Sequence, residues 1–329
     1  MISTNYKNKK IALIGCGYWG TILANNLITL GFKYLFVYDK DKKNSAILKK
    51  KFSKVNIVNK YDILLKDNTI DVFFIATPPS LNLSIVKKAI IHNKNIFLEK
   101  PGFKDVYDFY KIQKIKKKDK VLMFGYVYCF NDYIRFIKKK IYKKSLGNIL
   151  HINFQRQNLG PIRNDVQVAE DLSSHDLSII LDIFQKLPKV IYHNKYSILK
   201  KNISDISNLH MKLDKIYIDI NNTWLNPTKI RRITIIGSKK MLLFDEMDLL
   251  NPIKIYNKYA TYPKLQYFKK SFFKKKAQIY EGKVNLPRIK NSSPLKKEIE
   301  HFFNAISKNK KVLTNINFAL KISKFLKSI

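Results

Sequence analysis

Cysteine is scarce in this sequence, which has only Cys16 and Cys129 among its 329 residues. Two cysteines cannot form a disulfide framework, so we expect a chain that works in a reducing compartment, the cytoplasm. Long hydrophobic runs are also missing, since none approaches the ~18 residues that a membrane-spanning helix needs. The apolar stretch after the polar N-terminus stops at Gly15 and is too short for the core of a signal peptide. We therefore expect no membrane partner.

Arginine is the second residue in short supply. Lysine and arginine together number 63 against 24 acidic residues, a net charge of +39, but the arginines are only Arg135, Arg156, Arg163, Arg231, Arg232 and Arg288. Base readout and bidentate phosphate binding favour arginine, so the predominance of lysine argues against a nucleic-acid partner. The lysines cluster at 49–51, 114–118, 138–140 and 274–276. Scattered clusters of this kind are typical of solvated helix faces rather than of one polyanion-binding surface.

Hydrophobic residues, by contrast, make up 46% of the chain and aromatic residues 13%. Such a composition excludes a disordered protein and supplies enough side chains for a large core. The length corresponds to about two domains. We place the boundary near Tyr126, with a first domain over 1–125 and a second over 126–329.

A glycine-rich loop follows the first predicted strand. Lys10–Ile14 is a short apolar run that leads into the sequence G-C-G-Y-W-G at 15–20, and a helical pattern follows it. In such a loop Gly15 allows a tight turn, Gly17 lets the backbone approach a pyrophosphate, and Gly20 lets the helix pack close to the strand. The helix N-terminus then offers free N–H groups to the phosphates. This order of strand, loop and helix predicts a dinucleotide-binding unit.

The next predicted strand, Tyr34–Tyr38, ends at Asp39, about 20 residues beyond the glycines. A carboxylate there accepts hydrogen bonds from the hydroxyls of an adenosine ribose and repels a 2′-phosphate. NAD is therefore the expected cofactor. Lys40, Lys42 and Lys43 follow closely enough that NADP stays open as the alternative.

Strands and helices continue to alternate after Asp39. We predict strands at 72–75, 95–98 and 121–124, and helices at 81–92 and 105–118. The carboxyl ends of parallel strands meet at one edge of a sheet, where ligands bind. That edge would carry the residues that follow these strands, namely Thr77, Pro78, Glu99, Lys100 and Tyr126.

The second half of the chain has the pattern of an antiparallel sheet. Apolar and polar residues alternate over 209–213 and again over 216–220, the period of a half-buried strand. Two further strand patterns, 232–236 and 241–244, flank the hairpin-like turn at 237–240. We predict an α/β protein, with an N-terminal Rossmann doubly wound parallel sheet and a C-terminal α+β domain built on a large, open, mostly antiparallel sheet.

Taken together, four motifs resemble the glucose–fructose oxidoreductase/inositol dehydrogenase (Gfo/Idh/MocA) family. They are G-C-G-Y-W-G at 15–20, Ala76-Thr77-Pro78-Pro79, Glu99-Lys100-Pro101 and Asp171-x-x-x-His175. The segments 223–227, 229–237 and 293–303 look like the second domain of this family, and the whole is most similar to members encoded with surface-polysaccharide sugar pathways. The resemblance implies an NAD(P)-dependent sugar dehydrogenase whose second domain often mediates formation of a homo-oligomer.

The resemblance also implies a catalytic set formed by Lys100, Asp171 and His175. Lys100 would stabilise the alkoxide-like oxygen, His175 would act as general base, and Asp171 would orient the substrate or the lysine. It implies cofactor contacts from the glycine loop and the strand ends, which comprise Gly15, Gly17, Tyr18, Trp19, Gly20, Asp39, Thr77, Pro78, Glu99 and Lys100. Substrate contacts are expected from Tyr126, Arg156 and Arg163.

Several of these residues have a structural alternative. By pattern alone His175 is a helix-start residue, Trp19 packs at a domain edge, and Glu99 is a buried structural carboxylate. Arg163 either holds a substrate diphosphate or anchors its own loop. Asp176 and Asp182 are expected to be exposed charges of the helix that follows His175.

We expect an NAD-dependent oxidoreductase that transfers a hydride between a sugar ring hydroxyl and nicotinamide. A nucleotide-linked sugar, such as a UDP-N-acetylhexosamine or its uronic acid, is the first substrate class. An inositol or free-sugar dehydrogenase is the alternative, and a non-catalytic nucleotide- or polyanion-binding protein is a third interpretation. No metal is expected, because the six histidines show no paired ligand spacing.

Overall fold

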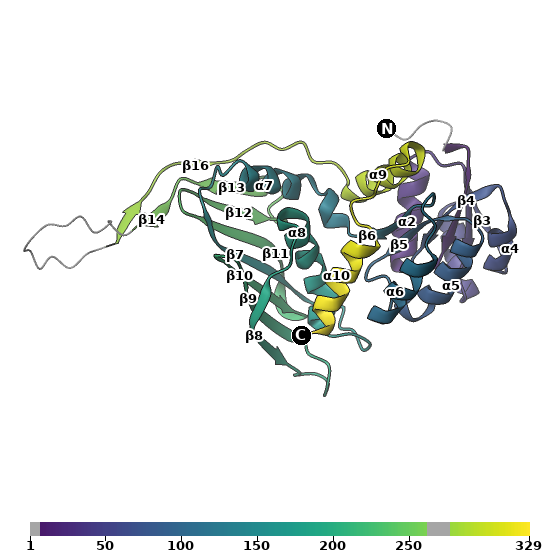
Figure 1. The fold of residues 1–329 in the computed structure, drawn as a ribbon, viewed down its shortest axis with the longest axis horizontal. Coiled ribbons are helices and arrows are strands. Elements are labelled where there is room, and N and C mark those ends of the chain that lie inside the picture. The colour runs from purple at the N-terminus through teal and green to yellow at the C-terminus, as the bar shows by residue number, and fades with distance from the viewer. Residues whose placement is uncertain (1–6, 262–276) are drawn as a thin grey trace, which may run out of the picture. The chain divides into compact units, whose positions relative to one another are not determined.

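The structure is a computed structural model in which residues 7–261 and 277–329 are described. The chain divides into two compact units, each of which we describe by itself (Figure 1). Unit 1 contains the residues up to Phe130 together with Ser292–Ser328, and unit 2 contains Asn131–Asn291. The lysine cluster at 274–276 lies outside the described residues.

Unit 1 is built on a parallel six-stranded sheet. Its strands are β1 (Lys10–Ile14), β2 (Tyr34–Tyr38), β3 (Val55–Ile57), β4 (Ile70–Ile75), β5 (Asn95–Glu99) and β6 (Leu122–Gly125). They lie in the order β3-β2-β1-β4-β5-β6, and every pair is parallel. The chain thus runs outward from β1 in one direction and from β4 in the other, which is the doubly wound order of a Rossmann fold.

Helices connect these strands and cover both faces of the sheet (Figure 1). They are α2 (Tyr18–Thr29), α3 (Lys42–Lys51), α4 (Tyr61–Lys66), α5 (Pro79–Ile91) and α6 (Val106–Ile115), and the short 3₁₀ helix η1 (Val127–Phe130) follows β6. Right-handed crossovers place α2 and α3 on one face and α5 and α6 on the other. The predicted strands and helices of this unit are therefore confirmed, whereas α3, β3 and α4 were not predicted.

The C-terminal helices belong to this unit as well. α9 (Pro294–Lys308) lies beside α2, and α10 (Ile316–Lys327) lies beside α6. The ring of Phe302 on α9 packs edge-on against Phe74 and Phe97 of the sheet, with centroids 5.6 and 5.8 Å away. Between the two helices, the Thr314 hydroxyl donates to the carbonyl of Phe124 over 2.6 Å.

This arrangement differs from the predicted division at 125/126. The first break in the structure follows Phe130, and residues 292–328, which we expected in the second domain, return to unit 1. The physical reason is the apolar face that α5 and α6 leave uncovered on β4 and β5. Burial of the Phe302 and Phe303 rings there is worth roughly 2 kcal/mol for each side chain.

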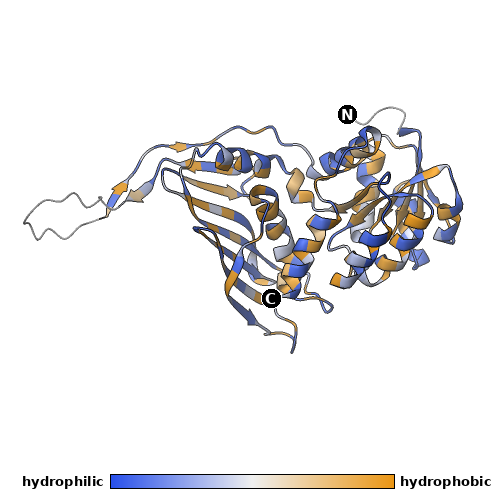
Figure 2. Cartoon of the chain, viewed as in Figure 1, coloured by the Kyte–Doolittle hydropathy of each residue, from blue (hydrophilic) through white to orange (hydrophobic). Residues whose placement is uncertain are grey.

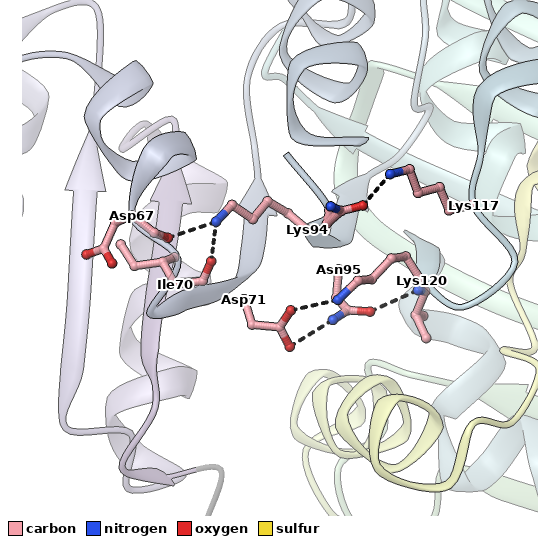
Figure 3. Close-up of polar contacts among 9 residues, drawn as sticks. Asp67, Ile70, Asp71, Lys94, Asn95, Lys117 and Lys120 are labelled. Atoms are coloured by element: carbon pink, nitrogen blue, oxygen red, sulfur yellow. Dashed lines mark hydrogen bonds and ion pairs between the residues drawn. The ribbon is translucent and has the colours of Figure 1, made fainter. Parts of the chain in front are cut away.

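A buried lysine joins strands at the amino end of the same sheet (Figure 3). Lys94 is only 3% exposed, and its ammonium group donates to the carbonyls of Asp67 and Ile70 over 2.8 and 2.7 Å. Burial lowers the pKa of this lysine below its ordinary value. Nearby, the carboxylate of Asp71 accepts from Lys120 over 3.1 Å. These contacts fix the edge opposite the one that carries the predicted site.

Unit 2 is built on an eight-stranded sheet with the order β16-β13-β12-β11-β7-β10-β9-β8. Only the β10–β7 pair is parallel. The strands are β7 (Ile149–Leu159), β8 (Lys189–Tyr196), β9 (Ile206–Leu213), β10 (Ile216–Thr223), β11 (Leu225–Gly237), β12 (Met241–Asp245), β13 (Ile253–Tyr256) and β16 (Val284–Asn285). A separate hairpin pairs β14 (Tyr259–Thr261) with β15 (Gln278–Tyr280). The predicted mostly antiparallel sheet is confirmed.

Hydrophobic and hydrophilic residues alternate along the central strands of this sheet (Figure 2). The buried members, such as Leu209 and Ile218, are fully shielded. The helices of the unit are α7 (Asp132–Tyr142), the π-helical turn η2 (Ala169–Ser173) and α8 (Ser174–Phe184). Tyr133 of α7 packs on Phe244 of β12 with ring centroids 5.5 Å apart, so α7 covers the apolar face there.

The charge of Asp182 on α8 is not exposed as predicted. Its side chain is 3% exposed and pairs with the Lys138 ammonium over 2.7 Å. α7 and α8 contact each other along this side, where the Tyr142 hydroxyl also donates to the carbonyl of Ile183. The exposed-face prediction for Asp182 is therefore wrong, because α8 is buried between its neighbours over almost its whole length.

Candidate functional site

The glycine loop of unit 1 has the backbone geometry that its glycines require. Gly15 has φ +93°, and a Cβ there would lie 2.5 Å from the carbonyl oxygen of Ala76. A Cβ on Gly20 would lie 2.0 Å from the carbonyl oxygen of Gly15, so α2 packs directly on the loop. A Cβ on Gly17 would meet nothing within 4 Å. Gly15 and Gly20 are thus fixed by packing, while Gly17 leaves the backbone open to a ligand.

The N-terminus of α2 is suited to bind an anion. No side chain among the described residues caps it, and its first turn has no acidic residue. Its N–H groups and the positive end of the helix dipole are therefore available to a pyrophosphate. Tyr18 is 85% exposed beside this end, and its ring stacks with that of Trp19 at 6.1 Å.

Asp39 lies directly against the glycine loop. Its Oδ2 accepts from the backbone N–H of Cys16 over 2.6 Å, and its Oδ1 accepts from the N–H of Asp41 over 2.9 Å. The carboxylate is therefore held in one orientation beside the amino end of α2. Burial, followed by the charge of Asp39, raises the pKa of the Cys16 thiol to about 12. The loop, the helix end and the carboxylate together fit an adenine dinucleotide.

The end of β4 contributes Thr77 and Pro78. The Thr77 hydroxyl donates to the side-chain oxygen of Asn82 over 2.5 Å, and Pro78 is the N-cap residue of α5, with Pro79 at the first helical position. Proline suits that position because it lacks an N–H group that the helix could not use. Both residues thus lie at the carboxyl edge of the sheet, as predicted.

The end of β5 carries a buried carboxyl group and a lysine. Glu99 is 7% exposed, and the backbone N–H of Lys100 donates to its Oε2 over 3.3 Å. A Cβ on Gly125, at the end of β6, would lie 2.8 Å from the same oxygen. The Glu99 carboxyl therefore leans over the end of β6. Burial raises its pKa to about 7, against the opposing effect of the Lys100 charge.

Tyr126 follows Gly125 and is 1% exposed. Its ring packs edge-on against Phe318 of α10, with centroids 5.5 Å apart, and burial raises the pKa of its hydroxyl. Tyr126 is thus a core residue of unit 1. Its predicted contact with a substrate stays a prediction.

Unit 2 holds the other predicted catalytic residues on one continuous helical stretch. Asp171 lies in the π-helical turn η2, and His175 lies in the first turn of α8. Both side chains are half-buried. The structure therefore brings Asp171 and His175 close in one helical segment, while Lys100 belongs to unit 1.

Arg163 lies beside Asp171. Its guanidinium donates to both carboxylate oxygens of Asp165 over 3.0 and 2.8 Å, and its Nη1 lies 3.8 Å from Asp171 Oδ1. The Arg163 side chain is 40% exposed. This guanidinium is therefore anchored within its own loop and also reaches the predicted catalytic segment.

Arg156 has a different environment. It is 4% exposed, and its Nε donates to Asp176 Oδ1 over 2.7 Å. Asp176 is 1% exposed, so the expectation that it is an exposed helix charge is wrong. Burial raises the pKa of Asp176, against the opposing charge of Arg156. This buried ion pair joins β7 to α8 and was not predicted, because neither residue type indicates burial in sequence.

Within residues 7–261 and 277–329, no group of three or more histidine, cysteine, aspartate or glutamate side chains could hold a metal ion. In the same described ranges, none of the helices is both long and apolar enough to cross a membrane. Glu298 on α9 was also missed by sequence reasoning. It is fully buried near Glu99 and had no motif that could have marked it.

Comparison with known proteins gives the following similarities. Residues 9–126 match the family model described as "Oxidoreductase family, NAD-binding Rossmann fold". An uncharacterized oxidoreductase of Streptococcus pneumoniae serotype 4 is 28% identical over 151 residues, which cover 45% of this chain and 40% of that protein. The matched region thus spans less than half of the relative's length.

Solved structures that are similar over nearly the whole chain include the following two. The UDP-N-acetylglucosamine 3-dehydrogenase GnnA from Acidithiobacillus ferrooxidans has a TM-score of 0.73 at 17% identity, covering 98% of this chain and 96% of that one. GenD2 from gentamicin A biosynthesis, solved in complex with NAD, has a TM-score of 0.78 at 14% identity, covering 100% and 95%. At such identities the likeness shows the fold.

The family match covers the glycine loop, Asp39, the end of β4 and the Glu99-Lys100 pair. It agrees with the helix end and carboxylate that fit a dinucleotide, and with the doubly wound sheet. Residues 9–126 therefore match the NAD-binding Rossmann domain of the Gfo/Idh/MocA oxidoreductase family.

Proposed function

We propose that this protein is an NAD-dependent dehydrogenase that transfers a hydride between a sugar ring hydroxyl and the nicotinamide. The observation that carries the proposal is the position of Lys100 directly after the buried Glu99, at the carboxyl end of β5 in an NAD-binding unit. Ligands of doubly wound sheets bind at this edge. We infer that the nicotinamide end of the cofactor lies at the ends of β5 and β6.

The chemistry needs a base for the hydroxyl proton and a positive group near the reacting oxygen. In the proposed mechanism Lys100 hydrogen-bonds that oxygen and stabilises its developing negative charge. His175 takes the proton, since an imidazole titrates near neutral pH. Asp171 orients the substrate or the Lys100 ammonium. Bound NAD supplies the hydride acceptor.

The proposed substrate class is a nucleotide-linked sugar, with UDP-N-acetylhexosamines and their uronic acids first. The fold likeness to a UDP-N-acetylglucosamine 3-dehydrogenase supports this class. The Arg163 guanidinium supports it too, since its side chain is 40% exposed beside Asp171 and such a group binds diphosphates. The alternative substrate class is a free sugar or polyol such as inositol, which carries no anionic group for Arg163 to bind.

The first experiment incubates the purified protein with excess NAD and a panel of UDP-sugars. We expect reduced-nicotinamide absorbance and, by mass spectrometry, loss of two hydrogens from one sugar. His175→Ala should lose turnover while it still binds NADH. Unchanged turnover in this variant would refute the assignment of His175 as the base.

Arg163→Ala distinguishes the two substrate classes. We expect it to raise KM for a diphosphate-linked sugar by at least tenfold, because a charged hydrogen bond contributes about 1.5–3 kcal/mol. A free polyol should be used equally well by both forms. Equal effects on both substrates would remove the proposed role of Arg163.

We also propose a homo-oligomer formed through the eight-stranded sheet, in the cytoplasm. The sheet face opposite α7 carries polar and aromatic side chains, among them Tyr192, whose ring stacks on His210 at 6.3 Å, and Tyr217, which is 52% exposed. On the same face, Asp219 bridges His151 and His210 over 2.8 and 2.9 Å. A monomeric mass by light scattering would count against this assembly.

A further inference from the structure

Unit 1 contains two buried glutamates that face each other from a strand and a helix. Glu99 ends β5, and Glu298 lies on α9 with no measurable exposure. Phe302 packs against Phe97. Glu99 is two residues beyond Phe97 on the same strand face, and Glu298 is one turn before Phe302 on the same helix side. The contact between the two rings therefore places the two carboxyl groups together.

In the part of the chain that the structure describes, neither oxygen of the buried Glu298 carboxyl has a hydrogen-bond partner. The backbone N–H of Tyr126 lowers the pKa of Glu298 to some extent, but that N–H donates to the carbonyl of Phe124 over 3.0 Å. Burial, followed by the nearby Glu99, raises the pKa of Glu298 well above its ordinary value. A buried carboxyl group in such surroundings is stable only when it is protonated.

The other titratable groups around the pair are few. Lys100 follows Glu99 on the strand, and its positive charge opposes the effect of burial on the pKa of Glu99. The 3₁₀ helix η1 contributes Cys129, which is 1% exposed, and Tyr126 precedes it. His301 on α9 accepts the N–H of Leu313 at its Nε2 over 3.0 Å, so that nitrogen carries no proton.

We propose that Glu99 and Glu298 form an acid pair that carries at most one negative charge, and that binding of the oxidised, positively charged nicotinamide expels one proton from the pair to solvent. Glu99, at the strand end, is the member that ionises. Glu298, behind it, stays protonated and is a positioning residue that acts through Glu99. The reduced nicotinamide is uncharged and expels no proton.

The charge balance explains why a proton is released when the oxidised nicotinamide binds and not when the reduced form binds. The carboxyl of Glu99 is neutral just below neutral pH, and it becomes a carboxylate when a positive charge is bound nearby. The proton leaves to water, and the net charge of the site is unchanged. Binding of the oxidised cofactor should therefore tighten by up to about tenfold for each pH unit below 7 and level off above it, whereas binding of NADH stays constant.

The inference rests on the proposed position of the nicotinamide, and calorimetry tests it. NAD⁺ and NADH are titrated into the cofactor-free protein at about pH 6.5, in two buffers that differ in ionisation enthalpy. The difference in heat gives the number of protons released. We expect up to one proton for NAD⁺ and none for NADH.

Two isosteric variants and one control sharpen this test. Glu99→Gln should abolish the proton release that accompanies NAD⁺ binding. Glu298→Gln should retain the release, since glutamine replaces a neutral acid. Glu281→Gln, which changes a carboxylate that is 68% exposed in unit 2, should have no effect. Equal proton counts for NAD⁺ and NADH, or a release that persists in Glu99→Gln, would overturn the proposal.

A second measurement needs no cofactor and applies even if the dinucleotide fails to bind. At about pH 8 the infrared spectrum of the cofactor-free protein should contain the carbonyl band of a protonated carboxyl group. This band should vanish in Glu298→Gln and remain in Glu281→Gln. Its absence from the unmodified protein would refute the acid pair. Failure of both nucleotides to bind, with the band present, would contradict the proposed function instead.

Discussion

The backbone N–H of Cys16 donates to the carboxylate of Asp39 over 2.6 Å and joins the first loop of the Rossmann unit to the end of its second strand. The same carboxylate accepts the N–H of Asp41. Asp39 therefore holds the glycine loop in shape in addition to its expected contact with the adenosine ribose. Loss of this side chain should affect both the loop and the choice of cofactor.

Replacement of Asp39 by alanine should weaken NADH binding by about 10- to 100-fold, since hydrogen bonds to a charged group contribute about 1.5–3 kcal/mol. The preference for NADH over NADPH should also fall, because the repulsion of a 2′-phosphate is removed. Fluorescence titration with both nucleotides measures the two effects. Asp41→Ala is the matched control, since Asp41 only caps α3 by accepting the N–H of Lys43. Loss of affinity in the control would mean that the loop as a whole, and not Asp39, governs binding.

The thiol of Cys16 should be unreactive in the folded protein. Its pKa of about 12, raised by burial and then by Asp39, lies about three units above the ordinary value. The thiolate population at about pH 8 is thus lowered roughly a thousandfold. Alkylation by iodoacetamide followed by peptide mapping should modify Cys16 only after unfolding. Rapid modification of Cys16 in the native protein would contradict the burial and the raised pKa of this thiol.

The buried pair of Arg156 and Asp176 should dominate the stability of unit 2. Arg156→Met leaves the Asp176 charge buried without its cation and should lower the free energy of unfolding by about 3–5 kcal/mol. Arg232→Met is the control, because the Arg232–Asp245 pair is partly exposed, and it should lower that free energy by no more than about 1 kcal/mol. Urea unfolding measures both values. Similar losses in the two variants would contradict the special role of the buried pair.

The acid pair predicts an unusual dependence of stability on pH. The folded pKa of Glu99 is about 7 and its ordinary value is 4.5. Between these values the folded protein holds a proton on Glu99 that the unfolded chain has lost, so this residue makes the unfolding free energy fall by about 3 kcal/mol as the pH rises. Glu99→Gln should remove this part of the decline, while the part that is due to Glu298 remains. We expect its stability, relative to the unmodified protein, to be higher at about pH 8 than at about pH 5 by that amount, as measured by urea unfolding. An unchanged pH profile would show that Glu99 ionises normally.

The parts of the fold that the sequence predicts are those with strong local signals. Gly15 and Gly20 are required by contacts with backbone atoms that no other residue can make, so the loop is recognisable from three glycines in order. Asp39 and Lys100 follow directly on buried strands, and parallel pairing brings strand ends to one edge. The alternation in β9 and β10 marks a half-buried sheet in the same way.

The parts that escape prediction depend on contacts between distant segments. Asp176 looks like an ordinary first-turn charge until β7 brings Arg156 beside it. Glu298 belongs to an amphipathic helix. The pattern of that helix predicts that one face is buried, but it does not predict which part of the protein that face contacts. The sequence also does not indicate that a helix from the end of the chain covers the sheet face under Phe302. A buried parallel strand is apolar on both sides, so its pattern does not show which segment covers either face. Residues 126–130 and 292–328, which we expected in the second domain, therefore belong to unit 1 in the structure.

Because residues 292–328 complete unit 1 and follow unit 2 in the chain, unit 1 can close only after all of unit 2 has been made. During synthesis the strands of the six-stranded sheet are made first, and Phe74 and Phe97 stay without the helix that covers them until all of 131–291 has been translated. An apolar sheet face that stays exposed throughout this time is a binding surface for chaperones and a starting point for aggregation. The yield of folded protein should therefore depend on how fast the intervening residues are translated, and a nascent chain that stalls before Ser292 would be left with an open core.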